Sequence, residues 1–512
     1  MTSSAPDARD DQRTTGLTAS IAISLAVASV IHLLVLLRGF YSATLDESGR
    51  TLDAYNWIRG SETLATVWLP FYKLIVGGTL LIAPDLFVTP RVVSCLFGMA
   101  ALCSLIWLSH GLFKNRTTTL FTGLIGAVFP PRVVLSVAPL AEIMFIAAIT
   151  LAIAFLVRWF SAGRRREVLL AALFFAIASS VRYEGWVFVV AFAALVLFLW
   201  LIPVNGKRLS FKTARDSILA AVSFVVLWIT LHFIQHGRPL GFIADTAGRY
   251  ALIHGDSVVS LLSNNPLTQF ALQNVWTLNI LGLLSLFAFT RQNVHNRMVV
   301  SVPALALFIV STIALLGKGM PTHGFWRIPA VWSILLVPFT AHWFVIRLGS
   351  VDASAKLKNV GLVCMLVAVF ALCVNGIYSM TERSAFSRDD LAAGRYLHAQ
   401  LSEQTSGNSH KVLIESGIWS YVNVMIASQH PEQFILNSGF DPVAHAEPLL
   451  NPDEPFDNST LQRMEVHLLV FRREDYKDYL DARREIRRLG DCGPWTIYAL
   501  VSPQPALSFN VR

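Results

Sequence analysis

Runs of about 20 apolar residues recur along most of the chain, and this pattern constrains the fold more than any other feature. A helix needs about 20 mostly apolar residues to cross a bilayer. We expect spans at residues 17–37, 89–113, 117–130, 139–160, 167–181, 185–203, 217–236, 268–290, 298–317, 326–346 and 359–379. The chain is 54% hydrophobic and only 14% charged, whereas soluble domains carry about 25% charged residues. The sequence therefore predicts a polytopic α-helical membrane protein with about eleven spans.

Lysine and arginine collect in alternate loops between these spans. The basic loops lie near residues 114–116, 164–166, 207–215, 291–297 and 347–358. Because basic loops stay in the cytoplasm, we expect these loops and the N-terminal tail 1–16 inside, and the loop 38–88 outside. The same loops account for the net charge of +8, so no nucleic-acid partner is expected. The apolar segment 68–83 is interrupted by proline and glycine, which indicates a re-entrant or interfacial helix.

The composition changes after the last span, where charged and turn residues appear throughout. Apolar runs of strand length occur at 412–414, 434–436, 466–471 and 495–501, and helix-like stretches near 388–404 and 474–488. Alternating strand and helix patterns are typical of an α/β domain. We therefore expect a membrane domain over 17–380 and an extracytoplasmic α/β domain over 381–512.

Asp46 and Glu47 are adjacent carboxylates in the first outer loop. They could be solvated loop acids, as is common where a helix leaves the membrane. However, a helix-like stretch follows over 50–60, and its Tyr55 and Trp57 favour the membrane interface. A carboxylate held at the bilayer surface can accept a proton from a hydroxyl group, so a catalytic role is the alternative.

Four further ionisable residues stand at the outer ends of spans. They are Arg132, Glu142, Arg182 and Glu184. Glu142 could be an ordinary acid at a helix N-terminus, where the helix dipole stabilises it, and the others could be interface charges. Charges near a membrane are costly, however, so they tend to be paired or functional.

A short outer loop before the span 326–346 contains His323 and Arg327. A lone histidine is more often a satisfied surface group than a ligand. Basic residues on the outer side of the membrane are unusual under the positive-inside rule. We therefore expect Arg327 and Arg182 each to bind a particular anion. Since arginine suits phosphate recognition, the outer face could bind a phosphate-bearing lipid. No phosphate loop or dinucleotide motif occurs.

These residues resemble the GT-C superfamily of membrane glycosyltransferases. More narrowly, the chain is similar to the group of dolichyl-phosphate-mannose-protein mannosyltransferases and aminoarabinose transferases. The family's acidic pair, tyrosine-containing helix, glycine and hydrophobic-proline element match Asp46-Glu47, Tyr55, Gly60 and Trp68-Leu69-Pro70. At the third and fourth spans the family has a proline, then a serine, then Leu-x-Glu, which match Pro130, Ser136 and Leu140-Ala141-Glu142. The arginine of the outer loop before one of its last spans matches Arg327. Leu45 stands where many members have a histidine, which leaves the donor sugar open.

The resemblance implies an inverting transfer of a sugar from a polyprenyl-phosphate donor to an acceptor hydroxyl, at the outer face of a bacterial inner membrane. Asp46 would be the general base, and Glu47 would orient the base or acceptor. Arg182, Arg327 and His323 would bind the donor phosphate. Glu142, Glu184, Tyr55 and Arg132 would shape the donor or acceptor site. The acceptor could be a glycan, lipid or protein.

The resemblance leaves a divalent metal open, since some members use one and others do not; Asp46 and Glu142 would bind it. No other cofactor is expected. Two other functions remain: a transporter or flippase of lipid-linked sugars, and a non-catalytic scaffold for envelope assembly. A transporter would place ionisable residues near the bilayer midplane, whereas these candidates cluster at the outer ends of spans.

Overall fold

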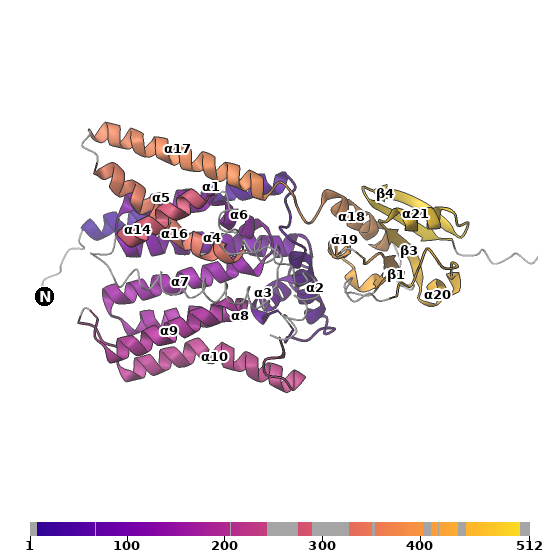
Figure 1. Cartoon of the computed structure of the whole chain (residues 1–512), viewed down its shortest axis with the longest axis horizontal. Coiled ribbons are helices and arrows are strands. Elements are labelled where there is room, and N and C mark those ends of the chain that lie inside the picture. The colour runs from indigo at the N-terminus through magenta and orange to yellow at the C-terminus, as the bar shows by residue number, and fades with distance from the viewer. Residues whose placement is uncertain are drawn as a thin grey trace, which may run out of the picture.

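Helices make up most of the protein in a computed structural model of the chain. The structure describes residues 8–66, 68–204, 206–242, 275–288, 327–350, 354–402, 411–417, 419–438 and 447–501. Within these residues the helical body extends to Met380, and the strands of the sheet begin at Lys411. Figure 1 shows the sheet at one end of the helical body.

The helices of the body follow the predicted spans closely. They are α1 (Ala8–Leu37), α4 (Val88–Phe113), α5 (Arg116–Val128), α6 (Pro130–Val137), α7 (Ala141–Ala162), α8 (Arg165–Val181), α9 (Glu184–Leu201), α10 (Phe211–His236), α14 (Trp276–Ala288), α16 (Arg327–Gly349) and α17 (Ala355–Met380). Seven helices in the described residues are long and apolar enough to cross a membrane, and the bent pair α5 and α6 would make an eighth. The predicted polytopic membrane fold is confirmed.

Some predicted boundaries differ from the structure. The sequence predicts a loop at Pro130–Arg132, but the chain bends by 55° after α5 and continues there as α6. Proline at the first helical position is favourable because its missing N–H would have no partner there. α10 begins earlier than residue 217 because Ser210 caps it, accepting a hydrogen bond from Thr213 N. The predicted span 298–317 lies outside the described residues.

The outer loop between α1 and α4 contains two short helices, α2 (Asp46–Ile58) and α3 (Pro70–Leu80). An ion pair joins them, in which Nζ of the buried Lys73 lies 2.9 Å from Asp53 Oδ1. Gly77 also permits close contact, since a Cβ there would lie 3.0 Å from the side chains of Trp57 and Ile58. α2 is therefore fixed on α3.

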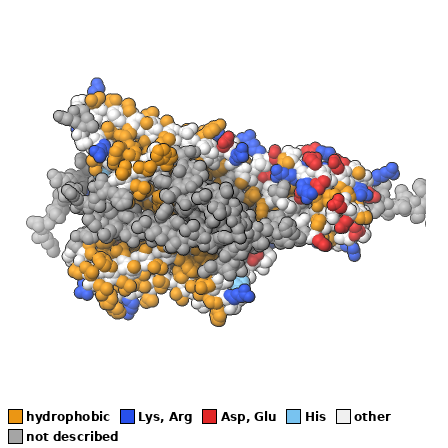
Figure 2. Space-filling model, in the orientation of Figure 1, with side chains coloured by type: hydrophobic (Ala, Val, Ile, Leu, Met, Phe, Trp, Pro, Cys, Tyr) orange, Lys and Arg blue, Asp and Glu red, His pale blue; other side chains and the backbone are white. Residues whose placement is uncertain are grey.

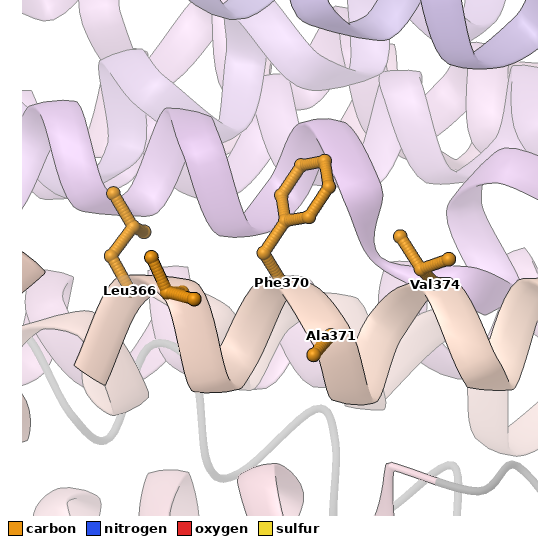
Figure 3. Close-up of a pocket in the computed structure, with 5 residues that line it drawn as sticks. Leu366, Phe370, Ala371 and Val374 are labelled. Atoms are coloured by element: carbon orange, nitrogen blue, oxygen red, sulfur yellow. The ribbon is translucent and has the colours of Figure 1, made fainter. Parts of the chain in front are cut away.

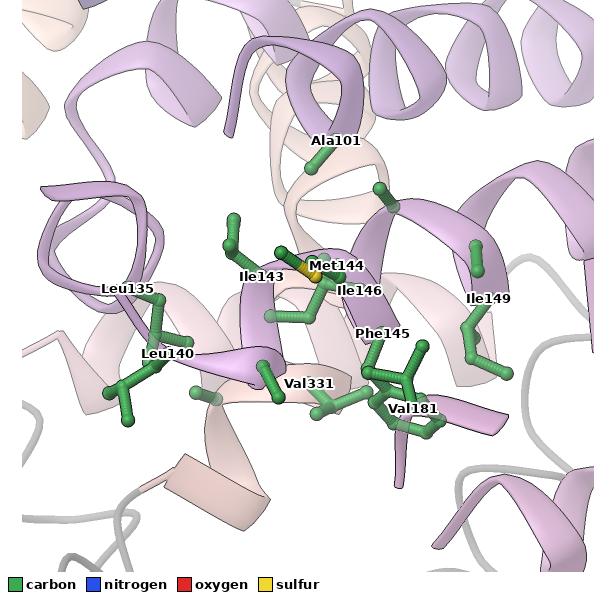
Figure 4. Close-up of a cluster of buried hydrophobic side chains, with 14 of the residues drawn as sticks. Ala101, Leu135, Leu140, Ile143, Met144, Phe145, Ile146, Ile149, Val181 and Val331 are labelled. Carbon is green, nitrogen blue, oxygen red and sulfur yellow. The ribbon is translucent and has the colours of Figure 1, made fainter. Parts of the chain in front are cut away.

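The core of the helical body is centred on α7, which packs against α4 and α8. Figure 4 shows its first three turns surrounded by apolar side chains from neighbouring helices. Ile143, Phe145 and Ile149 are completely buried there. This packing fixes the N-terminus of α7, where Glu142 lies.

On the face shown in Figure 2, the described surface of the helical body is largely apolar, and charged side chains gather on the domain that contains the sheet. α17 presents a continuous apolar face to the outside, with Val360, Val363 and Val367 each more than half exposed. Leu366, Phe370 and Val374 line a shallow groove along the same helix (Figure 3). Such a face suits contact with lipid chains, as expected for a multi-pass membrane protein.

The C-terminal domain is a small α/β unit with a five-stranded sheet in the order β2-β1-β3-β5-β4. Its elements are α18 (Arg388–Ser402), β1 (Lys411–Ile414), α19 (Tyr421–Ser428), η2 (Pro431–Gln433), β2 (Phe434–Leu436), α20 (Asn458–Arg463), β3 (Val466–Phe471), α21 (Glu474–Asp481), β4 (Ile486–Cys492) and β5 (Trp495–Leu500). β1 is parallel to β2 and β3, whereas β5 is antiparallel to β3 and β4. The predicted α/β fold is confirmed.

The strand β4 falls partly in the stretch 474–488 that the sequence predicts as helical. α21 ends at Asp481, and Ile486–Cys492 then forms a strand at the edge of the described sheet, where it pairs with β5. Its charged residues do not show the apolar alternation that marks a half-buried strand. An edge strand tolerates such charges because one side faces solvent.

Candidate active site

Glu47 holds the chain where it enters α2. Its buried carboxylate accepts hydrogen bonds from Ala43 N at 2.8 Å, Thr44 N at 3.0 Å and Thr44 Oγ1 at 2.6 Å. This resembles a capping box, in which a glutamate reaches back to a Ser or Thr three residues earlier. Burial raises the pKa of Glu47, and the hydrogen bond from Thr44 opposes that rise. Glu47 thus fixes the turn beside Asp46.

Asp46 is the more accessible of the two acids, with a side chain that is 30% exposed. Its Oδ2 accepts a hydrogen bond from Arg327 Nη2 at 2.9 Å. In the described part of the chain no hydrogen bond reaches its Oδ1. The carboxylate is therefore oriented by an arginine through one oxygen and can receive a proton through the other.

Glu142 lies completely buried in the first turn of α7. Arg182, which follows α8, donates from Nη1 to Glu142 Oε1, and Arg327 Nη1 lies 3.2 Å from the same oxygen. Arg182 also donates from Nε to Glu184 Oε2 at 3.0 Å. The two arginines share the Glu142 carboxylate and connect Asp46 to Glu184.

Arg50 is a member of this site that the sequence analysis missed. It is buried one helical turn after Asp46, and its guanidinium lies 5.0 Å from the ring centre of Trp68. Its Nε is buried without a hydrogen-bond partner in the described residues. Burial lowers the pKa of Arg50, while the charges of Glu142 and Asp46 oppose this. The sequence could have indicated Arg50, because it lies four residues after Asp46 and residues four apart share one face of a helix.

We use the name ion-pair cluster for six side chains: Asp46, Glu142, Arg182, Glu184 and Arg327, which are connected by ion pairs, and Arg50, whose charge is influenced by those of Glu142 and Asp46. It balances three carboxylates against three guanidinium groups. All six lie within about one turn of a helix end. The fold therefore gathers charges at the ends of its helices, away from their middles.

Arg132 does not belong to the ion-pair cluster. It is fully buried in α6, where its Nη2 donates to Ala127 O at 2.7 Å and its Nη1 donates to Gly98 O at 3.2 Å. The guanidinium thereby satisfies carbonyl groups at the bend between α5 and α6. Arg132 therefore stabilises the packing of the helices. Its hydrogen-bond partners among the described residues do not include Asp46 or another member of the ion-pair cluster.

Tyr55 also lies apart from the ion-pair cluster, since its hydroxyl donates to Glu432 Oε2 of the C-terminal domain at 2.7 Å. Burial and this glutamate raise the pKa of Tyr55 to about 12. The predicted phosphate ligand His323 lies outside the described residues.

The donor set does not favour a metal between Asp46 and Glu142. The guanidinium of Arg327 lies between their carboxylates, 2.9 Å from Asp46 Oδ2 and 3.2 Å from Glu142 Oε1. A divalent cation at that place would be repelled by the arginine charge. In the part of the chain that the structure describes, no three His, Cys, Asp or Glu side chains are arranged to hold a metal ion.

Solved structures share the architecture of this chain. A crystal structure of ArnT from Cupriavidus metallidurans in the apo state aligns with a TM-score of 0.60 over 95% of this chain and 99% of that chain, at 11% identity. The chain has the fold of ArnT. The structure of ArnT bound to undecaprenyl phosphate aligns with a TM-score of 0.61 over 95% of this chain and 100% of that chain, also at 11% identity. The likeness covers nearly the full length of both chains, and it is a likeness in fold.

Sequence comparisons add nothing to the likeness in fold, because no protein-family model and no curated protein matches the chain. At 11% identity, the ArnT fold does not by itself assign an activity, since one fold can host different functions.

Proposed function

We propose that the protein is a glycosyltransferase that moves a sugar from a polyprenyl-phosphate donor to an acceptor hydroxyl, with inversion at the anomeric carbon. The observation that carries this proposal is the partly exposed Asp46 carboxylate, which is paired with the buried Arg327 and lies in one group with Arg50 and Arg182. The ArnT fold supports the donor class, since one ArnT structure was solved with undecaprenyl phosphate bound. The acceptor can be a glycan, a lipid or a protein.

The proposed reaction is a single displacement. Asp46 removes the proton from the acceptor hydroxyl as its oxygen attacks the anomeric carbon opposite the phosphate. The new bond between that oxygen and the sugar forms while the bond from the sugar to the phosphate oxygen breaks. The bonding electrons go to the phosphate, whose developing charge requires cations already in place. Polyprenyl phosphate is released, and the proton remains on Asp46 until water removes it.

Arg50 is the arginine best suited to bind the leaving phosphate. Arg182 and Arg327 already bind Glu142, Glu184 and Asp46. Arg50, by contrast, has a buried Nε without a partner in the described residues. A phosphate oxygen would satisfy that donor and add the negative charge that a buried guanidinium needs. Arg327 would then orient Asp46, and His323 remains a predicted phosphate ligand.

The positions of the charges favour an enzyme over the two alternatives. A flippase would place ionisable groups near the bilayer midplane, whereas the ion-pair cluster lies at the helix ends that the basic loops indicate as the outer ends of the spans. A scaffold would have no use for an accessible carboxylate held by an arginine. Neither Asp46 nor Glu142 needs a metal in this scheme, because Arg327 supplies the positive charge between them.

The proposal is tested with purified protein in detergent or nanodiscs. Undecaprenyl phosphates carrying different sugars would be incubated with cell-envelope extracts as the source of acceptor, and the sugar would carry a radioactive label. We expect the label to move from the polyprenyl-phosphate fraction to one acceptor fraction. If no donor in the panel supports transfer, the proposal fails, and a vesicle assay for movement of the intact lipid-linked sugar would then test the flippase.

The proposed side of the membrane follows from the basic loops. We expect a reporter enzyme that is active only in the periplasm to be active when fused after residue 400, within α18. A reporter fused within the basic loop near Arg164–Arg166 serves as the control and should be inactive. Activity with the reverse pattern would place the ion-pair cluster on the cytoplasmic side and contradict this location.

A further inference from the structure

A buried hydrogen-bond chain joins the C-terminal domain to the turn that carries Asp46. Ser48 Oγ on α2 donates to Asn423 Oδ1 on α19 at 2.7 Å. Asn423 Nδ2 donates to Asp390 Oδ2 and to Ala385 O, each at 2.9 Å. Asn423 is completely buried, and Ser48 is 3% exposed. A fully satisfied polar group at this depth fixes one arrangement of its neighbours.

The orientation of the Asn423 amide follows from the groups around it. Asp390 accepts hydrogen bonds from Trp495 Nε1 on β5 at 2.8 Å and from Ser387 N at 3.0 Å. An ionised carboxylate only accepts hydrogen bonds, so the amide NH₂ must face Asp390 and the amide oxygen must face Ser48. The sheet therefore sets the direction of a hydrogen bond that ends on α2.

The start of α2 depends on contacts from this domain. Leu45 at its N-cap provides no side-chain hydrogen bond. The chain entering the helix is bonded to the segment that leads into the C-terminal domain, since Ser384 Oγ accepts from Tyr41 N at 3.0 Å and Ala385 N donates to Ser42 O at 3.0 Å. The first turn of α2 is thus held between Glu47 on its own side and the C-terminal domain on the other.

We propose that Asn423 is a positioning residue: through Ser48 it holds the first turn of α2, so that the C-terminal domain completes the active site by fixing the Asp46 carboxylate. This inference rests on the proposed transferase function. Asn423 acts through α2 and touches no reacting atom. A displacement of about 1 Å in a catalytic group can lower a rate by about 100-fold, so loss of one such contact should be visible in the kinetics.

The test uses the full chain with Ser48→Ala, Asn423→Ala and the double variant. Each single variant should lower kcat by roughly 10- to 100-fold with the donor KM unchanged. The double variant should be no slower than the slower single variant, because both changes remove the same hydrogen bond. Ser48→Ala leaves the C-terminal domain unaltered, so its result stands even if Asn423→Ala folds poorly.

Gln429→Gly is the matched control for general loosening of the domain contact. Gln429 also bridges the two domains, accepting from Leu86 N at 2.7 Å, but it does so at the start of α4. Its φ of +63° suits glycine, so the change removes the contact without backbone strain. We expect its kcat to equal that of the wild type.

Hydrogen exchange provides a second measurement that does not depend on activity. Amides in the first turn of α2 should exchange faster in Ser48→Ala and Asn423→Ala, and at the wild-type rate in Gln429→Gly. Unchanged exchange in the two α2-directed variants would overturn the inference, as would faster exchange with wild-type kcat or rate losses that simply multiply in the double variant. A wild type without transferase activity would instead contradict the proposed function, and exchange would still decide whether Asn423 holds α2.

Discussion

Replacing Asp46 by asparagine should lower kcat by roughly 100- to 10,000-fold, which is the usual contribution of a general base. The amide oxygen can still accept the hydrogen bond from Arg327, so the turn should remain in place. The amide cannot take up the proton of the acceptor hydroxyl. We therefore expect the donor KM to change little, and transfer measured with the labelled donor to fall to near background.

Glu62→Gln is the matched control, because it makes the same chemical change at an exposed carboxylate in the loop after α2. It should transfer sugar at the wild-type rate. Thermal unfolding of both variants would show whether the protein is intact. Wild-type kcat in Asp46→Asn would exclude Asp46 as the general base, and another group of the ion-pair cluster would then be the candidate.

Local patterns were sufficient to predict most of the helices and the start of the site. A span is defined by its own run of apolar residues, so α4, α7, α9 and α17 are visible in the sequence without knowledge of their neighbours. The acids of α2 also have a local signature, since Asp46 and Glu47 are adjacent carboxylates in an outer loop and precede a stretch whose Tyr55 and Trp57 favour the membrane interface. The sequence therefore identified Asp46 before any contact was known.

The pairing of charges could not be predicted in this way. Glu142 and Arg327 begin helices that are far apart in the chain, and no local pattern indicates that their side chains meet. Arg132 is the opposite case, a charge that was expected in the site and lies elsewhere. Its position between the predicted spans 117–130 and 139–160 suggested the outer end of a span, but the bend into α6 buries it and turns its guanidinium towards backbone carbonyls. Tertiary packing, rather than sequence spacing, decides which of these charges share a site.

Removing the charge of Glu142 should have the largest effect on stability. Glu142→Gln leaves the buried Arg327 and the largely buried Arg182 beside a neutral amide, and loss of one partner from a buried ion pair costs roughly 3–5 kcal/mol. We expect the free energy of unfolding in detergent, measured with denaturant, to fall by that amount. Sugar transfer should also be lost, because Arg327 would no longer be held between Glu142 and Asp46.

A double-variant comparison separates this charge effect from simple loss of packing. In Glu142→Gln combined with Arg182→Gln, the negative and positive charges are removed together. The double variant should therefore lose less stability than the sum of the two single losses. Asp216→Asn is the control, since Asp216 pairs with Arg165 at 2.7 Å where both side chains are accessible to water, and exposed pairs contribute little. If the losses of stability in Glu142→Gln and Arg182→Gln are additive, then the two side chains do not stabilise each other. The ion-pair cluster would then not act as one unit.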